Sequence, residues 1–353
     1  MNTATKVFSF SKIMLTATIM AVCTMTAFAS DALMTEAQGI FKPIPAYPPE
    51  IEGNPATADK LELGKMLFFE PRISKSGFIS CNSCHNVGMG GMDYQPTSTG
   101  HGWKQGPRNA PTVLNSVYNV AQFWDGRAKD LAEQAKGPIQ AGVEMNNTPE
   151  NVVKTLKSMP EYVELFKSSF PGEKDPVTFD NMAKAIEVFE AALITPDSRF
   201  DKFLNGNSAA LSNTEKEGLK LFIDNGCASC HGGINMGGDD YYAMGVVNMP
   251  GKDIMAGDKG RFSVTHAKDD EFMFKSPSLR NIEITPPYFH SGAVWGLQEA
   301  VAVMNDSQIG ADLSDKDIEK ITAFLLTATG VQPKVEYPIL PAPTDGTLKP
   351  SLK

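Results

Sequence analysis

Two copies of the pattern Cys-x-x-Cys-His constrain this chain more than any other feature of its sequence. Their residues are Cys81, Cys84 and His85, then Cys227, Cys230 and His231. The pattern is typical of covalent haem c attachment, in which both thiols form thioethers with the porphyrin and the histidine becomes an axial iron ligand. A disulfide framework would not explain the repeated histidine, and the context that a zinc or thioredoxin-like motif needs is not evident. The sequence therefore predicts two covalently bound haems.

The first 29 residues have the order of parts of a secretory signal peptide. Lys6 and Lys12 precede an apolar run that begins at Ile13, and Ala27-Phe28-Ala29 forms a small-x-small cleavage site. A retained membrane anchor is the alternative, but the run is short for a span. Cleavage near Ala29 would leave four cysteines, all in the two motifs, and would change the net charge from −9 to −11. We expect an exported, periplasmic protein whose acidic balance argues against nucleic-acid partners and weakly favours a basic protein partner.

The two motifs belong to a tandem duplication. A Gly-x-x-Leu-Phe segment precedes each motif, at 64–68 and 218–222, on a predicted short amphipathic helix. Downstream, five residue pairs share an offset of 166: Pro111 and Pro277, Asn115 and Asn281, Phe123 and Phe289, Gly126 and Gly292, Leu131 and Leu297. Because the motifs themselves differ by only 146, the second half has a longer connection after its motif. Few segments alternate with period two, so the predicted fold is mainly helical.

The boundary between the halves is predicted near Pro196. A helical stripe of core type precedes it, comprising Met182, Ile186, Phe189 and Leu193. Thr195-Pro196 ends this helix because proline cannot continue it. We therefore expect an N-terminal haem domain over 30–195, a C-terminal haem domain over 196–332 and a proline-rich tail over 333–353.

The sixth iron ligands decide what such a protein does. In the second half, Met304 lies on a predicted helix, and a thioether ligand there would give a His/Met haem of raised reduction potential. Core packing is the alternative for any one methionine. The first-half counterpart of Met304 at the 166 offset is Pro138, which cannot ligate iron. The sequence thus predicts that the two haems are not equivalent.

The first haem must find its sixth ligand elsewhere or leave that position open. The candidates are His101, Met89, Met92 and Met145. His101 stands in a glycine-rich loop from which it could bind the iron in one state and leave in another, although it could equally be a solvated loop histidine. An iron that loses its sixth ligand can bind peroxide, whereas one held on both sides only passes electrons. Peroxide cleavage also needs an acid–base group, for which Gln134 and Glu144 are candidates, with a solvated surface glutamate as the alternative.

The chain resembles the bacterial di-haem cytochrome c peroxidases over nearly all of its mature length. The segments that carry the resemblance are both haem motifs with GHGW, FWDGRA, GVEMN, PPYFHSGAVW and AVAVM. The resemblance implies two tandem cytochrome c-like domains, with the tail packing back on the N-terminal one. It also implies reduction of hydrogen peroxide to water with electrons from a small donor, either a c-type cytochrome or a copper protein.

The resemblance also implies roles for individual residues. His85 would be the proximal ligand of a low-potential peroxidatic haem and His101 its releasable distal ligand. His231 and Met304 would hold the high-potential haem that accepts electrons. Trp124 would lie between the haems.

The remaining implied residues form a pocket and a metal site. Glu144 would be the proton-transfer carboxylate, with Gln134 and Phe123 lining the same pocket. The Asn109 side chain and the carbonyls of Thr285 and Pro287 would bind calcium, which prefers such oxygen ligands. A calcium-promoted homodimer is implied as well.

Two other functions remain open at this point. A relative of the family oxidises a protein substrate and has tyrosine where Met304 stands, so Met304 argues against that function. A plain di-haem electron carrier would keep both irons six-coordinate. Trp103, His266 and Trp295 receive no catalytic role from the sequence.

Overall fold

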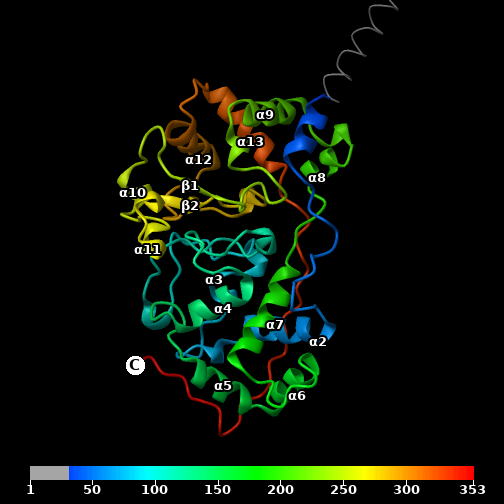
Figure 1. Cartoon of the computed structure of the whole chain (residues 1–353), viewed down its shortest axis with the longest axis vertical. Coiled ribbons are helices and arrows are strands. Elements are labelled where there is room, and N and C mark those ends of the chain that lie inside the picture. The colour runs from blue at the N-terminus through cyan, green and yellow to red at the C-terminus, as the bar shows by residue number, and fades with distance from the viewer. Residues whose placement is uncertain (1–31) are drawn as a thin grey trace, which may run out of the picture.

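The computed structural model describes residues 32–353 as two helical lobes, stacked along the long axis of the molecule (Figure 1). The expected signal peptide, 1–29, lies outside the described residues. The lower lobe contains α2 (Ala58–Phe69), α3 (Cys81–Cys84), α4 (Leu131–Gln140), α5 (Pro149–Lys157), α6 (Pro160–Ser169) and α7 (Phe179–Ala191). The upper lobe contains α8 (Arg199–Leu204), α9 (Asn213–Asp224), α10 (Lys252–Met255), α11 (Phe262–Thr265), α12 (Leu297–Met304) and α13 (Asp315–Leu326). The predicted mainly helical fold is confirmed.

Each lobe is built on one crossed pair of helices, α2 with α7 and α9 with α13. Both crossings need a glycine, because a Cβ atom at Gly64 would overlap the carbonyl oxygen of Ala185, and one at Gly218 would overlap that of Lys320. The glycine of each Gly-x-x-Leu-Phe segment therefore allows the two helix backbones to approach closely. Capping boxes at Ser212 for α9 and at Ser314 for α13 fix where these helices begin.

Phenylalanines at matched positions fill the two crossings. Phe68 packs on Phe189 with ring centroids 5.2 Å apart, and Phe222 packs on Phe324 at 5.4 Å. All four rings are buried. Aromatic pairs at this separation contribute about 0.5–1.5 kcal/mol beyond the area they bury.

The backbone repeats as closely as the sequence does. Asn115 and Asn281 both adopt the left-handed region, with φ of 60° and 62°, as do Phe123 and Phe289 at 69° and 68°. Each asparagine begins a 3₁₀ turn, and an isolated bridge follows at 122–128 and again at 288–294. Matched strained positions in both halves confirm the duplication.

The longer connection of the second half forms a layer between the lobes (Figure 1). It contains the antiparallel strands β1 (Tyr241–Ala243) and β2 (Met273–Lys275), paired with Tyr242 opposite Phe274, together with α10 and α11. The Lys275 amide donates to the Trp124 carbonyl at 2.8 Å, and Gly126 packs directly under Tyr241. The connection thus holds the FWDGRA loop of the lower lobe.

The N-terminal helix packs in the upper lobe, whereas the C-terminal tail packs on the lower lobe. Residues 32–40 are helical, and Met34, Ala37 and Phe41 belong to the core of the upper lobe, although the sequence assigned residues 30–195 to the first domain. The division at 195/196 remains our proposal, with this N-terminal helix counted in the second domain. No helix within residues 32–353 is long and apolar enough to cross a membrane.

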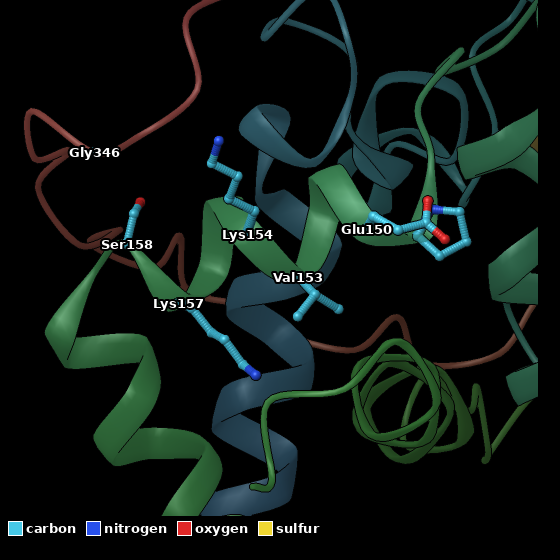
Figure 2. Close-up of a pocket in the computed structure, with 7 residues that line it drawn as sticks. Glu150, Val153, Lys154, Lys157, Ser158 and Gly346 are labelled. Carbon is cyan, nitrogen blue, oxygen red and sulfur yellow. The ribbon is translucent and has the colours of Figure 1, made fainter.

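The tail over 333–353 runs down the lower lobe to its far end (Figure 1). Arg72 donates to the Pro341 carbonyl at 2.7 Å, and Tyr337 packs on Phe69 at 4.9 Å. Figure 2 shows the tail at Gly346 passing Ser158, just after α5. A surface hollow lies there, and the Lys154 and Lys157 side chains at its edge point away from each other (Figure 2).

One buried hydroxyl joins the two repeats. The side-chain amides of Asn115 and Asn281 both donate to Thr195 Oγ1, at 2.7 and 2.9 Å. The side-chain oxygen of Asn115 accepts a hydrogen bond from the Thr195 backbone amide, and that of Asn281 accepts one from the equivalent backbone amide of Gly330. Both asparagines and Thr195 are almost completely buried.

Candidate haem centres

Short helical turns display both Cys-x-x-Cys-His motifs. The first is α3, where the Ser80 amide donates to Ser83 Oγ at 2.9 Å and the His85 amide donates to the Cys81 carbonyl at 2.9 Å. The second is a 3₁₀ turn over Cys227–Ser229, entered through the left-handed Gly226. Both turns therefore hold two thiols one turn apart and place a histidine immediately after them.

All four thiols within residues 32–353 are free, and their environment fits thioether attachment. Burial raises the pKa of all four, that of Cys84 and that of Cys227 to about 11, so the thiols are neutral in the unliganded protein. No cluster of three or more His, Cys, Asp or Glu side chains suited to a metal ion occurs in the described part of the chain. Zinc binding by either motif is thus disfavoured.

A cavity of about 250 Å³ with a mostly apolar lining lies in the upper lobe and extends to the lower lobe, where residues between Met92 and Trp124 line it. Cys227, Cys230 and His231 line it together with Met304, which stands at the end of α12. The structure therefore brings together the histidine and the methionine that the sequence paired. One imidazole, one thioether and an apolar wall are the donor set and surroundings that a His/Met haem needs.

The two motif histidines, His85 and His231, have similar surroundings. Neither His85 Nδ1 nor His231 Nδ1 makes a hydrogen bond of standard geometry, although both atoms are buried. Burial lowers the pKa of both rings, and nearby backbone groups, including those of Pro111 for His85 and Pro277 for His231, partly oppose it. Both rings are thus held neutral, which is the state that ligates iron.

His101 sits on a hairpin loop that is closed by its own hydrogen bonds. The Gly106 amide donates to the Ser98 carbonyl, and the Gly100 amide donates to that of Lys104, both at 2.9 Å. His101 is only 3% exposed, and its Nδ1 has no partner. Burial lowers the pKa of His101, and the charges of two lysines lower it further. A buried neutral imidazole without a partner is suited to iron ligation.

The loop contacts the Glu144 turn through its backbone. The His101 amide donates to the Glu144 carbonyl at 2.7 Å. Gly100 lies so close to this turn that a Cβ atom would come within 2.6 Å of Glu144 Cα and would overlap the Val143 carbonyl oxygen. His101 and Glu144 are therefore neighbours by construction.

Glu144 lies beside the first haem motif. Burial raises the pKa of its carboxyl and the charge of Arg127 lowers it, while Glu144 itself helps to raise the pKa of the Cys84 thiol. The Arg127 guanidinium stacks 3.4 Å from the centre of the Phe123 ring, and this ring packs against Gly137 of α4, the helix that carries Gln134. Sequence reasoning missed Arg127, although it stands in the FWDGRA segment.

The three methionines predicted as alternative ligands of the first haem differ in their surroundings. Met89 is 45% exposed, Met92 is buried and lines the cavity, and Met145 belongs to the core of the lower lobe, against which Cys81 packs. Trp103 and Trp295, which received no catalytic role, are largely exposed and pack on Phe78 and Tyr94 respectively.

Trp124 lies at the junction of the lobes. Its indole Nε1 donates to the Asn109 carbonyl at 3.0 Å, and its ring lies 6.2 Å from that of His290, its repeat counterpart. Trp124 lines the upper cavity, as does Pro111, which is also a backbone neighbour of His85. The indole thus lines the same cavity as His231 and Met304, and its position between the two haems stays a prediction.

The three residues predicted to bind calcium lie at this junction. Asn109, Thr285 and Pro287 all line the cavity. The Asn109 amide nitrogen donates to the Gln95 carbonyl at 3.0 Å, which leaves its Oδ1 available. Within residues 32–353, no hydrogen bond ends on Asn109 Oδ1 or on the carbonyls of Thr285 and Pro287.

Comparisons with known proteins agree with this arrangement. A family model for di-haem cytochrome c peroxidase matches residues 58–209, and one for cytochrome c matches 215–329. The cytochrome c551 peroxidase of Pseudomonas aeruginosa is 55% identical, with 91% of this chain and 93% of the relative covered. That of Nitrosomonas europaea is 49% identical, with 94% and 96% covered.

A crystal structure of a MauG-like protein associated with microbial copper homeostasis has a TM-score of 0.72 at 28% identity, and it covers 81% of this chain and 95% of its own. The expected fold of two tandem cytochrome c-like domains is thereby confirmed, and each domain implies one haem c. With two haem motifs in matched repeats and relatives aligned along almost its whole length, the chain belongs to the di-haem cytochrome c peroxidase family.

Proposed function

We propose that this protein reduces hydrogen peroxide at the His85 centre with electrons that enter at the His231/Met304 centre. The observation that carries this proposal is an asymmetry between the lobes. In the upper lobe a methionine of α12 lines the same cavity as a motif histidine. In the lower lobe the corresponding helix position is Pro138, and the buried imidazole nearby belongs to the His101 loop, which contacts the turn of the partly buried Glu144.

When bound, the two haems supply an electron store and an iron at which the O–O bond of peroxide is cleaved. Glu144 is the proposed proton carrier. Because burial raises its pKa, this carboxyl can take a proton from one peroxide oxygen and return it to the other near neutral pH. Phe123 and Gln134, from neighbouring elements, exclude bulk water and orient the substrate.

His101 is the proposed gate of this pocket. Its loop keeps its own internal hydrogen bonds, so it can move as a unit. Departure of the loop would break the hydrogen bond from the His101 amide to the Glu144 carbonyl, and His101 would then no longer hold the iron of the first haem, which could bind peroxide beside Glu144. Trp124, bonded to the Asn109 carbonyl, is the proposed intermediate in electron transfer between the centres.

The remaining assignments extend this proposal to partners and place. We assign Asn109, Thr285 and Pro287 to calcium, supported by their three unpaired oxygens at the junction. The electron donor is a small redox protein. The printed names of two relatives point to a c-type cytochrome, and a copper protein remains the other class. A homodimer and a periplasmic location after cleavage near Ala29 complete the proposal.

Two alternative functions make distinguishable predictions. A di-haem electron carrier has no use for a partly buried carboxyl beside a detachable loop, which favours peroxidase turnover. A protein-oxidising enzyme of the same family has tyrosine at the position of Met304. Here Met304 lines the cavity with His231, which favours a stable thioether ligand.

The test is peroxide-dependent oxidation of a reduced small cytochrome by the mature di-haem protein, before and after one-electron prereduction. The parent is expected to need prereduction, His101→Gly to turn over without it, and Glu144→Ala to lose turnover in both states. Haem spectra of each variant establish that both centres are loaded. Absence of turnover in every state, with both irons remaining six-coordinate, would leave an electron carrier.

A further inference from the structure

The two halves of the chain are bonded to each other on all sides of Trp124. Four residues of the first half, which form two pairs of chain neighbours, each bond to a different residue of the second half at 2.5 to 2.9 Å. The pairs are Arg108 with Asp258, Asn109 with His290, Trp124 with Lys275, and Asp125 with Arg261. Three of these contacts use a backbone group of the first half, whereas that of Arg108 with Asp258 joins two charged side chains.

The Arg108 guanidinium bonds to one carboxylate from each half. Its Nε and Nη2 donate to the two oxygens of Asp258, at 2.5 and 2.8 Å, and its Nη1 donates to Asp125 Oδ2 at 2.5 Å. All three side chains are 15% exposed or less. The planar fork of arginine fixes the direction of its partners as well as their distance. Arg108 therefore sets how Asp125 and Asp258 lie relative to each other.

This ion pair stands next to the bond that holds the indole. Arg108 precedes Asn109 in the chain, and Asp125 follows Trp124. The Asn109 carbonyl accepts from Trp124 Nε1 at 3.0 Å, so the two segments are joined twice, at adjacent residues. A shift of Arg108 relative to Asp125 would move the carbonyl that orients the indole. Through Asp258, the same guanidinium ties the indole to the second half of the chain.

We propose that Arg108 is a positioning residue for electron transfer, which holds Trp124 in a fixed place relative to the His231/Met304 centre. Without the guanidinium, the nearly buried carboxylates of Asp125 and Asp258 would lose their shared partner and repel each other. The segments on either side of the indole would then separate. This inference rests on the proposed role of Trp124 and names the side chain that orients it.

The experiment adds one electron rapidly to the oxidised holoprotein and follows its redistribution between the two haems from their separate spectra. Arg108→Gln removes the fork and should slow the redistribution at least about tenfold, because a displacement of about 1 Å has effects of this size or larger. The midpoint potential of each haem is measured in every variant, so that a changed driving force is distinguished from a changed position.

A matched control is available in the second half. Arg199 also forms a bidentate ion pair, with Glu215 at 2.7 and 2.6 Å, but both residues belong to the same lobe. Arg199→Gln should leave the redistribution unchanged. A slowing as large as that of Arg108→Gln would overturn the inference, because loss of any such ion pair would then suffice.

A double-mutant cycle tests whether Arg108 acts through the indole. Trp124→Phe alone should slow the redistribution, and adding Arg108→Gln should slow it little further, because no indole remains to be held. Slowing by the same factor in both backgrounds would overturn the inference and leave Arg108 as a general contact between the lobes.

Asp258→Asn provides a milder variant if Arg108→Gln does not fold. It breaks the contact between the halves but leaves Arg108 paired with Asp125, so no nearly buried charge loses its last partner. It should also slow the redistribution, and only when Trp124 is present. A rate equal to that of the parent in this variant, with Trp124→Phe slowed, would contradict the proposed link from Asp258 to the indole.

The outcomes distinguish this inference from the proposed function. Peroxide does not enter the measurement, so a preparation without peroxide turnover removes the peroxidase and leaves the comparison of rates valid. Redistribution in Trp124→Phe as fast as in the parent removes the role of Trp124 and this inference with it. A slowed Trp124→Phe beside an unaffected Arg108→Gln removes only the role of Arg108.

Discussion

Substitution of Gly100 is the sharpest test of the proposed His101 gate, because a side chain at this position would clash with the Glu144 turn, whereas the backbone conformation would allow one. Its φ of −117° suits any residue. A Cβ atom there would nevertheless approach Glu144 Cα to 2.6 Å and overlap the Val143 carbonyl oxygen. Gly100→Ala should therefore push the His101 loop away from the Glu144 turn while the internal hydrogen bonds of the loop remain.

The structure sets the size of this effect. Overpacking one methyl group against rigid backbone costs about 1–3 kcal/mol. Loss of the bond from the His101 amide to the Glu144 carbonyl costs about 0.5–1.5 kcal/mol more. A loss of about 2–4 kcal/mol from the closed state changes the closed-to-open ratio about thirtyfold to a thousandfold.

The assay compares the fraction of five-coordinate first haem in the fully oxidised protein, and its peroxide turnover without prereduction. Gly100→Ala should raise both, whereas Gly106→Ala in the same loop should change neither, because a Cβ at Gly106 meets nothing closer than 3.7 Å. A six-coordinate, prereduction-dependent Gly100→Ala variant would refute the idea that this contact closes the gate.

Three further predictions concern acid–base chemistry, ligation and stability. Arg127→Gln removes the charge that lowers the pKa of Glu144, so the acid limb of the kcat/KM profile should move to higher pH; a limb that stays in place would argue against Glu144 as the base. Met304→Leu should lower the potential of the second haem and abolish electron entry, as measured by redox titration and by reduction with the donor; an unchanged potential would exclude the thioether ligand. Gly218→Ala should lower the free energy of unfolding by about 1–3 kcal/mol because it clashes with α13, whereas Gly39→Ala, which meets nothing within 4 Å, should raise it by about 0.5–1 kcal/mol; chemical denaturation would show whether the signs differ.

Much of the fold and of the second haem centre could be predicted from the sequence. Haem attachment requires a short motif, and the duplication repeats short segments, so both can be recognised locally. The Cys-x-x-Cys-His spacing is fixed by one helical turn, and the structure forms that turn at both copies. The glycines of the Gly-x-x-Leu-Phe segments turned out to mark the two helix crossings. The counterpart of Met304, Pro138, predicted that the two haems are not equivalent, and the family resemblance paired Met304 with His231.

The parts that the sequence did not reveal depend on contacts between distant segments. Composition suggested that Gly100 gives the loop freedom, whereas the structure uses it for a close approach to a turn more than forty residues away. Glu190 lies within the span 182–193 but outside the predicted core stripe. That stripe covers one face of α7, and it gave no reason to expect buried side chains on the other faces. The helix is in fact enclosed nearly all round, with Asn181, Glu187 and Glu190 buried among its apolar residues. The packing of the N-terminal helix, residues 32–40, in the core of the upper lobe also depends on contacts between segments that are distant in the sequence.

The hydroxyl of Thr195 has a mechanical consequence. Because Asn115 and Asn281 both donate to this one oxygen, the lobes are fixed to each other at a point on the chain where a linker would be expected. Pulling the lobes apart would leave a buried side-chain amide without its acceptor. Hydrogen bonds from the layer of β1 and β2 to the lower lobe, such as that from the Lys275 amide to the Trp124 carbonyl, resist the same movement. A half-molecule expressed alone would lose the contact at Thr195, and one repeat would lack the oxygen that the other still holds.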